Sequence, residues 1–103
     1  MEILNQSLSE ALNNRAFGEA IRLIYLITLQ NLIFNDLIVL QKDLPNRRIL
    51  SQIRNHEIKS VTQGLFRFYE QVWFGKKSVT EVDFEEIDQL YKVFLASLTS
   101  NKR

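Results

Sequence analysis

The only histidine of this 103-residue chain, His56, is the residue best suited to acid–base chemistry. A catalytic histidine needs a carboxylate that orients its ring and a nucleophile within hydrogen-bond reach. Glu57 follows it directly, but neighbours on a helix project about 100° apart, so Glu57 is poorly placed to orient the ring. The chain also has no cysteine, which excludes thiolate ligands, catalytic thiols and disulfides. We therefore predict no catalytic residue, no metal site and no cofactor, and expect His56 to be an exposed residue near a helix start.

An acidic run near the C-terminus is the second candidate for chemistry, because clustered carboxylates can bind cations. Calcium loops, however, need a glycine-bearing turn that presents alternating oxygen ligands, and this run has helical spacing and no glycine. The positive end of a helix dipole favours acidic side chains in the first turns. We expect a solvated helix start that carries Glu81, Asp83, Glu85, Glu86 and Asp88.

Four cations in the middle of the chain define what we call the basic region, which consists of Arg47, Arg48, Arg54 and Lys59. Arg47 and Arg54 are spaced so that they share one helical face. Such a surface could bind nucleic acid or the anionic inner leaflet of a membrane. The aromatic residues lie at core spacing instead of between these cations, so stacking on nucleic-acid bases has no support. We favour an ordinary solvated face over either binding function.

Trp73 and Phe74 could form an exposed aromatic docking site, because aromatic side chains are frequent hot spots of protein interfaces. Trp73 continues the helical stripe of Phe66 and Tyr69, so part of its ring should belong to the core. Phe74 lies off that stripe, and it is either an exposed anchor or tucked under the following loop. Basic and acidic residues lie on opposite sides of that loop, a pattern that orients a partner. The partner-binding candidates are Phe74, Lys76, Lys77, Glu81 and Asp83.

The elements that position these residues are predicted to be helices. Apolar residues at spacings of three and four indicate helices over residues 2–13, 15–34, 45–54, 57–74 and 81–98. The helix over 15–34 is apolar nearly all round, so several neighbours should bury it and it should be central. The apolar run 37–40 has no strand partner, and we interpret it as an extended segment packed on the core.

Several residues predict where these helices begin and end. Asp43, two residues before Pro45, is a candidate N-cap of the short helix. Gly75 is placed as a left-handed C-terminal cap. The segment Thr80-Glu81-Val82-Asp83 resembles a capping box, with aspartate in place of glutamate, and residues 99–103 should fray. Gly18 either permits a close helix crossing or is simply tolerated in a first turn.

Composition sets the limits on the whole molecule. The hydrophobic fraction of 46% and the charged fraction of 24% are those of a folded domain, and we expect one domain over residues 1–98. The net charge of +1 gives no electrostatic case for nucleic acid or membrane. Charged and amide residues interrupt the apolar segment 20–40, which predicts a core helix and not a membrane span. The expected fold is all-α: a compact bundle of four main helices and one short helix, with a tetratricopeptide-like hairpin at the N-terminus.

Two sequence blocks resemble the family called domain of unknown function 4129, over about residues 10–95. The first is residues 16–26 (AFGEAIRLIYL), and the second is residues 68–75 (FYEQVWFG), followed by Val79-Thr80 and Asp83-Phe84. The middle departs from the family, which has Thr-x-x-Glu where this chain has Pro45-Asn46-Arg47-Arg48. The resemblance implies a soluble C-terminal domain of bacterial membrane proteins, without established enzymatic activity. Some members are fused to transglutaminase-like domains, and many are encoded near AAA ATPases and von Willebrand factor A-like proteins.

These observations together predict a non-enzymatic, cytoplasmic protein-interaction domain. We expect it to be the C-terminal part of a larger membrane-anchored bacterial protein, at the cytoplasmic face of the inner membrane, and to be soluble as given. The expected partner is a protein and not nucleic acid, with membrane contact only through segments outside this chain or through weak surface contact. The alternative is a regulatory domain that binds anionic lipid or nucleic acid through the basic region, and the resemblance makes lipid the better of these two ligands.

Overall fold

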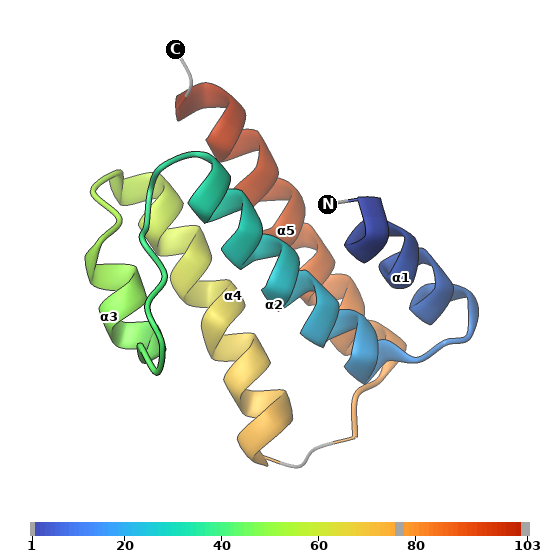
Figure 1. Cartoon of the computed structure of the whole chain (residues 1–103). Coiled ribbons are helices and arrows are strands. Elements are labelled where there is room, and N and C mark those ends of the chain that lie inside the picture. The colour runs from blue at the N-terminus through green and yellow to red at the C-terminus, as the bar shows by residue number, and fades with distance from the viewer. Residues whose placement is uncertain (1, 76–77, 102–103) are drawn as a thin grey trace.

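The computed structural model describes residues 2–75 and 78–101, and these residues form five helices without a strand (Figure 1). The helices are α1 (Glu2–Asn13), α2 (Phe17–Phe34), α3 (Asn46–Ser51), α4 (His56–Gly75) and α5 (Glu81–Asn101). Four of them are long and α3 has 6 residues, so the predicted all-α class and helix count are confirmed. The radius of gyration is 13.3 Å, close to the value of about 13 Å expected for a compact chain of this length.

Helix α2 lies at the centre of the bundle and packs against α1, α4 and α5 (Figure 1). Ala20, Ile21 and Ile24 on this helix are 0% exposed. Its length and mean hydropathy of 1.3 would also suit a membrane span, but here three neighbouring helices receive its apolar side chains. The prediction of a central helix over this segment is confirmed, although the helix begins at Phe17 and not at residue 15. The reason is that Arg15 has a left-handed φ of 55°, which a continuing helix cannot accommodate.

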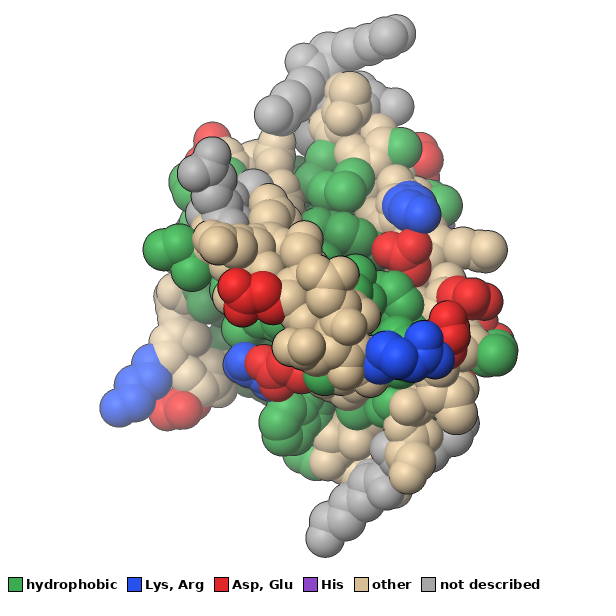
Figure 2. All heavy atoms as spheres, turned by 90° about the vertical axis from the view of Figure 1, so that its right-hand side faces the viewer, with side chains coloured by type: hydrophobic (Ala, Val, Ile, Leu, Met, Phe, Trp, Pro, Cys, Tyr) green, Lys and Arg blue, Asp and Glu red, His purple; other side chains and the backbone are tan. Residues whose placement is uncertain are grey.

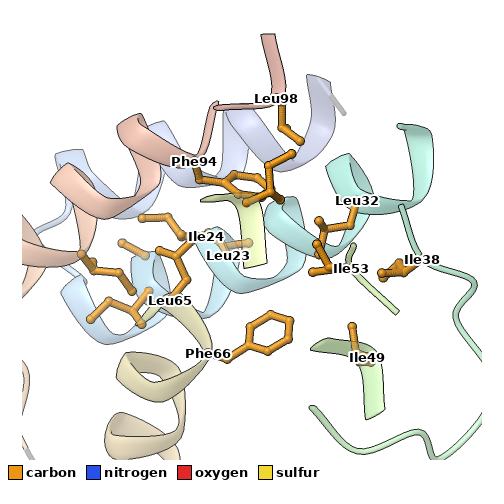
Figure 3. Close-up of a cluster of buried hydrophobic side chains, with 14 of the residues drawn as sticks. Leu23, Ile24, Leu32, Ile38, Ile49, Ile53, Leu65, Phe66, Phe94 and Leu98 are labelled. Carbon is orange, nitrogen blue, oxygen red and sulfur yellow. The ribbon is translucent and has the colours of Figure 1, made fainter. Parts of the chain in front are cut away.

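The two long C-terminal helices supply the other side of the core. Leu65 of α4 lies beside Ile24 of α2, Phe66 points toward the side of Ile49 of α3, and Phe94 of α5 lies above them (Figure 3). The apolar residues of α5 that recur at spacings of three and four face the core, with Phe84, Ile87, Phe94 and Leu98 buried and Tyr91 half-buried. Gly64 of α4 faces Leu90 of α5, because a Cβ atom at this glycine would lie 3.4 Å from Leu90 Cδ1. The sequence analysis did not single out this glycine.

Local hydrogen bonds fix the starts of α4 and α5. Asn55 Oδ1 accepts a hydrogen bond from the Ile58 amide at 2.9 Å, which is the usual N-cap contact. The Asp83 amide donates to Thr80 Oγ1 at 3.2 Å, and the Thr80 amide donates to Asp83 Oδ2 at 3.1 Å. These reciprocal bonds confirm the predicted capping box.

Several predicted helix ends are wrong. The short helix α3 ends at Ser51 and not at residue 54. Asp43 does not cap α3: it has a φ of 62°, and Pro45 takes the N-cap position without a side-chain hydrogen bond. Gly75 is the last residue of α4 and has no positive φ, so it is not a left-handed cap. The helix α5 continues to Asn101, where we expected fraying from residue 99, and the Thr99 hydroxyl bonds the Leu95 carbonyl at 3.3 Å.

The segment between α2 and α3 is extended, as predicted, but only part of it packs on the core. Ile38 is buried, whereas Val39 is 68% and Leu40 46% exposed. The side chain of Gln52 holds the segment, because its Oε1 accepts from the Val39 amide at 2.8 Å and its Nε2 donates to the Val39 carbonyl at 3.1 Å. Gly18 makes no close helix crossing, since the nearest atom to a Cβ there is Val79 Cγ2 at 3.9 Å.

Candidate functional site

His56 is exposed at the first residue of α4, as predicted. The neighbouring Glu57 carboxylate accepts a hydrogen bond from the Ser97 hydroxyl of α5 at 3.2 Å, so it joins two helices instead of orienting the imidazole. Within residues 2–75 and 78–101, no three His, Asp or Glu side chains lie close enough together to hold a metal ion. The carboxylate that follows His56 in the chain is therefore engaged with α5.

The acidic start of α5 is engaged in local contacts. Glu81 pairs with Arg15 at 3.0 Å across the turn that leads into α2, and Asp83 forms the capping box. Further along, Asp88 pairs with Lys92 at 2.9 Å. These carboxylates either cap the start of α5 or form ion pairs with nearby cations, which agrees with the predicted solvated helix start. Of the partner-binding candidates, Lys76 and Lys77 lie outside the described residues.

The end of α4 carries a short ladder of aromatic rings. Tyr25 of α2 stacks on Tyr69 of α4 with ring centroids 3.9 Å apart and planes 8° apart, and Tyr69 contacts Trp73 at 5.9 Å. Burial raises the pKa of both tyrosines. Trp73 is 48% and Phe74 81% exposed. Of the two alternatives that the sequence left open for Phe74, exposure is the observed one.

The four cations of the basic region do not all line one hollow. Arg47 and Lys59 border a hollow of about 450 Å³ between α3 and α4, which we call the cationic cleft. Arg48 borders a separate, smaller hollow beside Val39, and Arg54 borders neither. The cleft has a third cation, Arg67, which the sequence analysis missed. Its spacing of eight residues from Lys59 places both on one face of a helix, and that signal was present in the sequence.

A chain of hydrogen bonds fixes one end of the cationic cleft. The Tyr25 hydroxyl donates to Asn46 Oδ1 at 2.7 Å, and Asn46 Nδ2 donates to Glu70 Oε2 at 3.0 Å. These bonds connect α2, α3 and α4. Phe66, which is 2% exposed, lies under the cleft. The walls are therefore held in place by bonds and packing that do not depend on a ligand.

A second hollow, of about 470 Å³, lies between α1, α2 and the extended segment, and we call it the apolar groove. Its apolar lining consists of Ile3, Leu4, Leu26, Leu29, Ile33 and Leu40. Gln30 completes the lining, and its Oε1 is buried without a hydrogen-bond partner among the described residues. Figure 2 looks toward α1 and shows hydrophobic side chains exposed beside its polar outer face. The sequence analysis missed this groove, although the excess of apolar residues around α2 was its signal.

The residues predicted from sequence thus do not meet in one site. Phe74 is exposed at one end of the bundle, the acidic residues serve α5, and the basic region is divided. No known protein family, curated protein or solved structure matches the chain. The two hollows are the remaining candidate sites.

Proposed function

We propose that this chain is a non-enzymatic protein-interaction domain whose apolar groove receives a helix of a partner protein. The groove carries the proposal, because its lining has six apolar side chains, one amide and no charged group. Phe34, the chain neighbour of the groove residue Ile33, is 69% exposed. Large apolar side chains grouped on a surface favour association, since burying them removes apolar area from water.

The chemistry of the groove supports an amphipathic helix as its occupant. The first turn of α1 and the second half of α2, which run in opposite directions (Figure 1), line the groove together with Leu40. An apolar hollow between helices suits helix-in-groove binding through apolar residues at spacings of three and four. The buried Gln30 oxygen lacks a partner within the described chain. An unpaired buried acceptor is unfavourable, so a donor on the apolar face of the partner, such as an indole N–H or a hydroxyl, would be favoured there.

We also propose the cellular setting that the resemblance implies: the C-terminal part of a larger bacterial protein, at the cytoplasmic face of the inner membrane. Its support is that the two sequence blocks meet in space, through the stack of Tyr25 on Tyr69. The paired α1 and α2 also support a hairpin of the tetratricopeptide type. A full-length reading frame with a membrane span before this domain would agree with this setting, and a natural protein found entirely in the soluble fraction would contradict it.

The interaction is tested by photocrosslinking in cells that produce the natural full-length protein. A photoreactive phenylalanine replaces Phe34 beside the groove or, in a second strain, Phe74 at the end of α4. We expect a discrete protein adduct from position 34. Ile33→Lys should abolish it, whereas Val82→Lys should preserve it, because both residues are exposed but only Ile33 lines the groove.

The crosslinks also show which surface of the domain binds the partner, and whether that partner is a protein or a lipid. An adduct from position 74 alone would move the interface to the end of α4, which the sequence analysis favoured, and would refute the groove. An adduct whose added mass is that of a lipid would refute a protein partner. The alternative function, a regulatory domain that binds anionic lipid or nucleic acid through the whole basic region, has less support because Arg47, Arg48 and Arg54 do not share one hollow.

A further inference from the structure

The cationic cleft holds an excess of positive charge that the fold does not neutralise. Arg47, Lys59 and Arg67 line it, and none of them has an ion pair in the part of the chain that the structure describes. By contrast, two arginines elsewhere form ion pairs: Arg15 with Glu81, and Arg22 with Glu19. The cleft therefore gathers three free cations in one concave space.

The one carboxylate that lines the cleft is already partly engaged. Glu70 accepts a hydrogen bond from Asn46, which draws it to the end of the cleft that the Tyr25 hydroxyl also reaches through Asn46. Lys59 lies three helical turns away on α4, about 16 Å along the axis. Arg67 lies one turn from Glu70 on the same helix, so the cleft has three cations against one partly engaged carboxylate, and Lys59 is the cation farthest from that carboxylate along α4.

We propose that the cationic cleft is a binding site for the phosphate group of a small molecule. Its volume of about 450 Å³ lies in the range of small-ligand pockets. The planar guanidinium groups of Arg47 and Arg67 can each donate two parallel hydrogen bonds to phosphate oxygens, and Lys59 adds a point charge. A phosphate has enough acceptor oxygens to engage three cations at once.

The placement of the cations favours a compact ligand over a nucleic-acid strand. A strand needs a continuous basic track with stacking platforms. Here Arg48 borders a separate hollow, and Phe66 lies beneath the cleft with 2% of its surface exposed, too little to stack on a base. The walls are also fixed before binding by the Tyr25–Asn46–Glu70 bonds, which lowers the entropy cost of binding.

The test is a titration of the folded chain with inorganic pyrophosphate, followed by two-dimensional amide NMR. We expect saturable shifts confined to residues of α3 and α4 around the cleft. Arg67→Gln and Lys59→Gln should each weaken binding about tenfold, since a charged hydrogen bond contributes about that factor. Arg54→Gln is the matched control: it removes one exposed cation outside the cleft and should change the affinity less than about twofold.

A second arm distinguishes a soluble ligand from a lipid headgroup. Phosphatidylcholine vesicles, with and without phosphatidylinositol phosphate, are sedimented with the protein. Retention that needs the phosphoinositide and is lost in Arg67→Gln assigns the site to a headgroup, and pyrophosphate binding without retention assigns it to a soluble phosphate. Shifts that do not saturate, an equal loss in Arg54→Gln, or no response to either probe would each overturn the proposal. A thermal melt of each variant confirms that it is folded.

Discussion

Two threonines in the core allow a direct measurement of what an unpaired hydroxyl costs this fold. Thr28 of α2 and Thr62 of α4 are both 0% exposed. The Thr28 hydroxyl donates to the Ile24 carbonyl at 2.8 Å, whereas Thr62 Oγ1 has no partner among the described residues. The same substitution to valine at both sites keeps the shape and the β-branching of the side chain, so the difference between the two results isolates the hydroxyl.

We expect opposite outcomes for the two variants. A buried polar group without a partner costs about 1–3 kcal/mol, and Thr62→Val removes that group, so the free energy of unfolding should rise by about 1 kcal/mol. Thr28→Val removes a satisfied hydroxyl, while the Ile24 carbonyl keeps its helical acceptor role, so stability should stay constant or fall by up to about 1 kcal/mol. Threonine and valine have similar helix propensities, which removes that contribution from the comparison.

Urea unfolding followed by circular dichroism measures both variants against the natural sequence. A gain of about 1 kcal/mol should also raise the melting temperature by roughly 4–8 °C in a domain of this size. A loss of stability in Thr62→Val, or changes of equal size and sign in the two variants, would refute the argument. Either result would mean that the Thr62 hydroxyl finds a partner in solution.

Three further predictions concern packing, exposure and capping. Ile24→Ala should cost about 2–5 kcal/mol in urea unfolding, because Ile24 is 0% exposed in the central helix, and a loss below about 1 kcal/mol would show that α2 is peripheral. Phe74→Ala should change the free energy of unfolding by less than about 0.5 kcal/mol, because the ring is 81% exposed, and a melting temperature several degrees lower would show that it packs on the fold. Thr80→Ala should cost about 1 kcal/mol through loss of the capping box, with exposed Ser78→Ala as the control that should not.

Each of the two hollows is built from residues of more than one element. The cations of the cationic cleft lie on α3 and α4, and only the packing of the short helix on α4 brings Arg47 toward Lys59 and Arg67. The apolar groove depends on residues from α1, α2 and the extended segment. Sequence spacing identifies which residues share a helical face, but it does not say which two faces adjoin. The sequence therefore contained signals for single helical faces, but the hollows themselves could be located only once the helices were placed.

Features that depend on neighbours in the chain were predicted from the sequence. The capping box needs only residues three apart, and the buried stripe of α5 follows from apolar residues at spacings of three and four. The central place of α2 was predictable because a helix apolar on every side needs neighbours on several sides. Helical hydrogen bonds and side-chain periodicity act over one or two turns, so the local sequence contains the information that specifies them.

Features that depend on the path of the chain beyond a helix end were decided by the tertiary structure alone. Whether Phe74 is exposed depends on the path of the chain after α4, and the sequence allowed both outcomes until 81% exposure was observed. The Gly75 and Asp43 predictions failed because the backbone takes another conformation at each: Gly75 has no positive φ, and Asp43 has a φ of 62° and lies before the N-cap Pro45. The link from Tyr25 through Asn46 to Glu70 joins three helices. The helices were predictable from the sequence, because helical hydrogen bonds and side-chain spacing act between residues close in the chain. Tertiary packing decided which surfaces remain exposed, because burial depends on contacts between residues far apart in the chain.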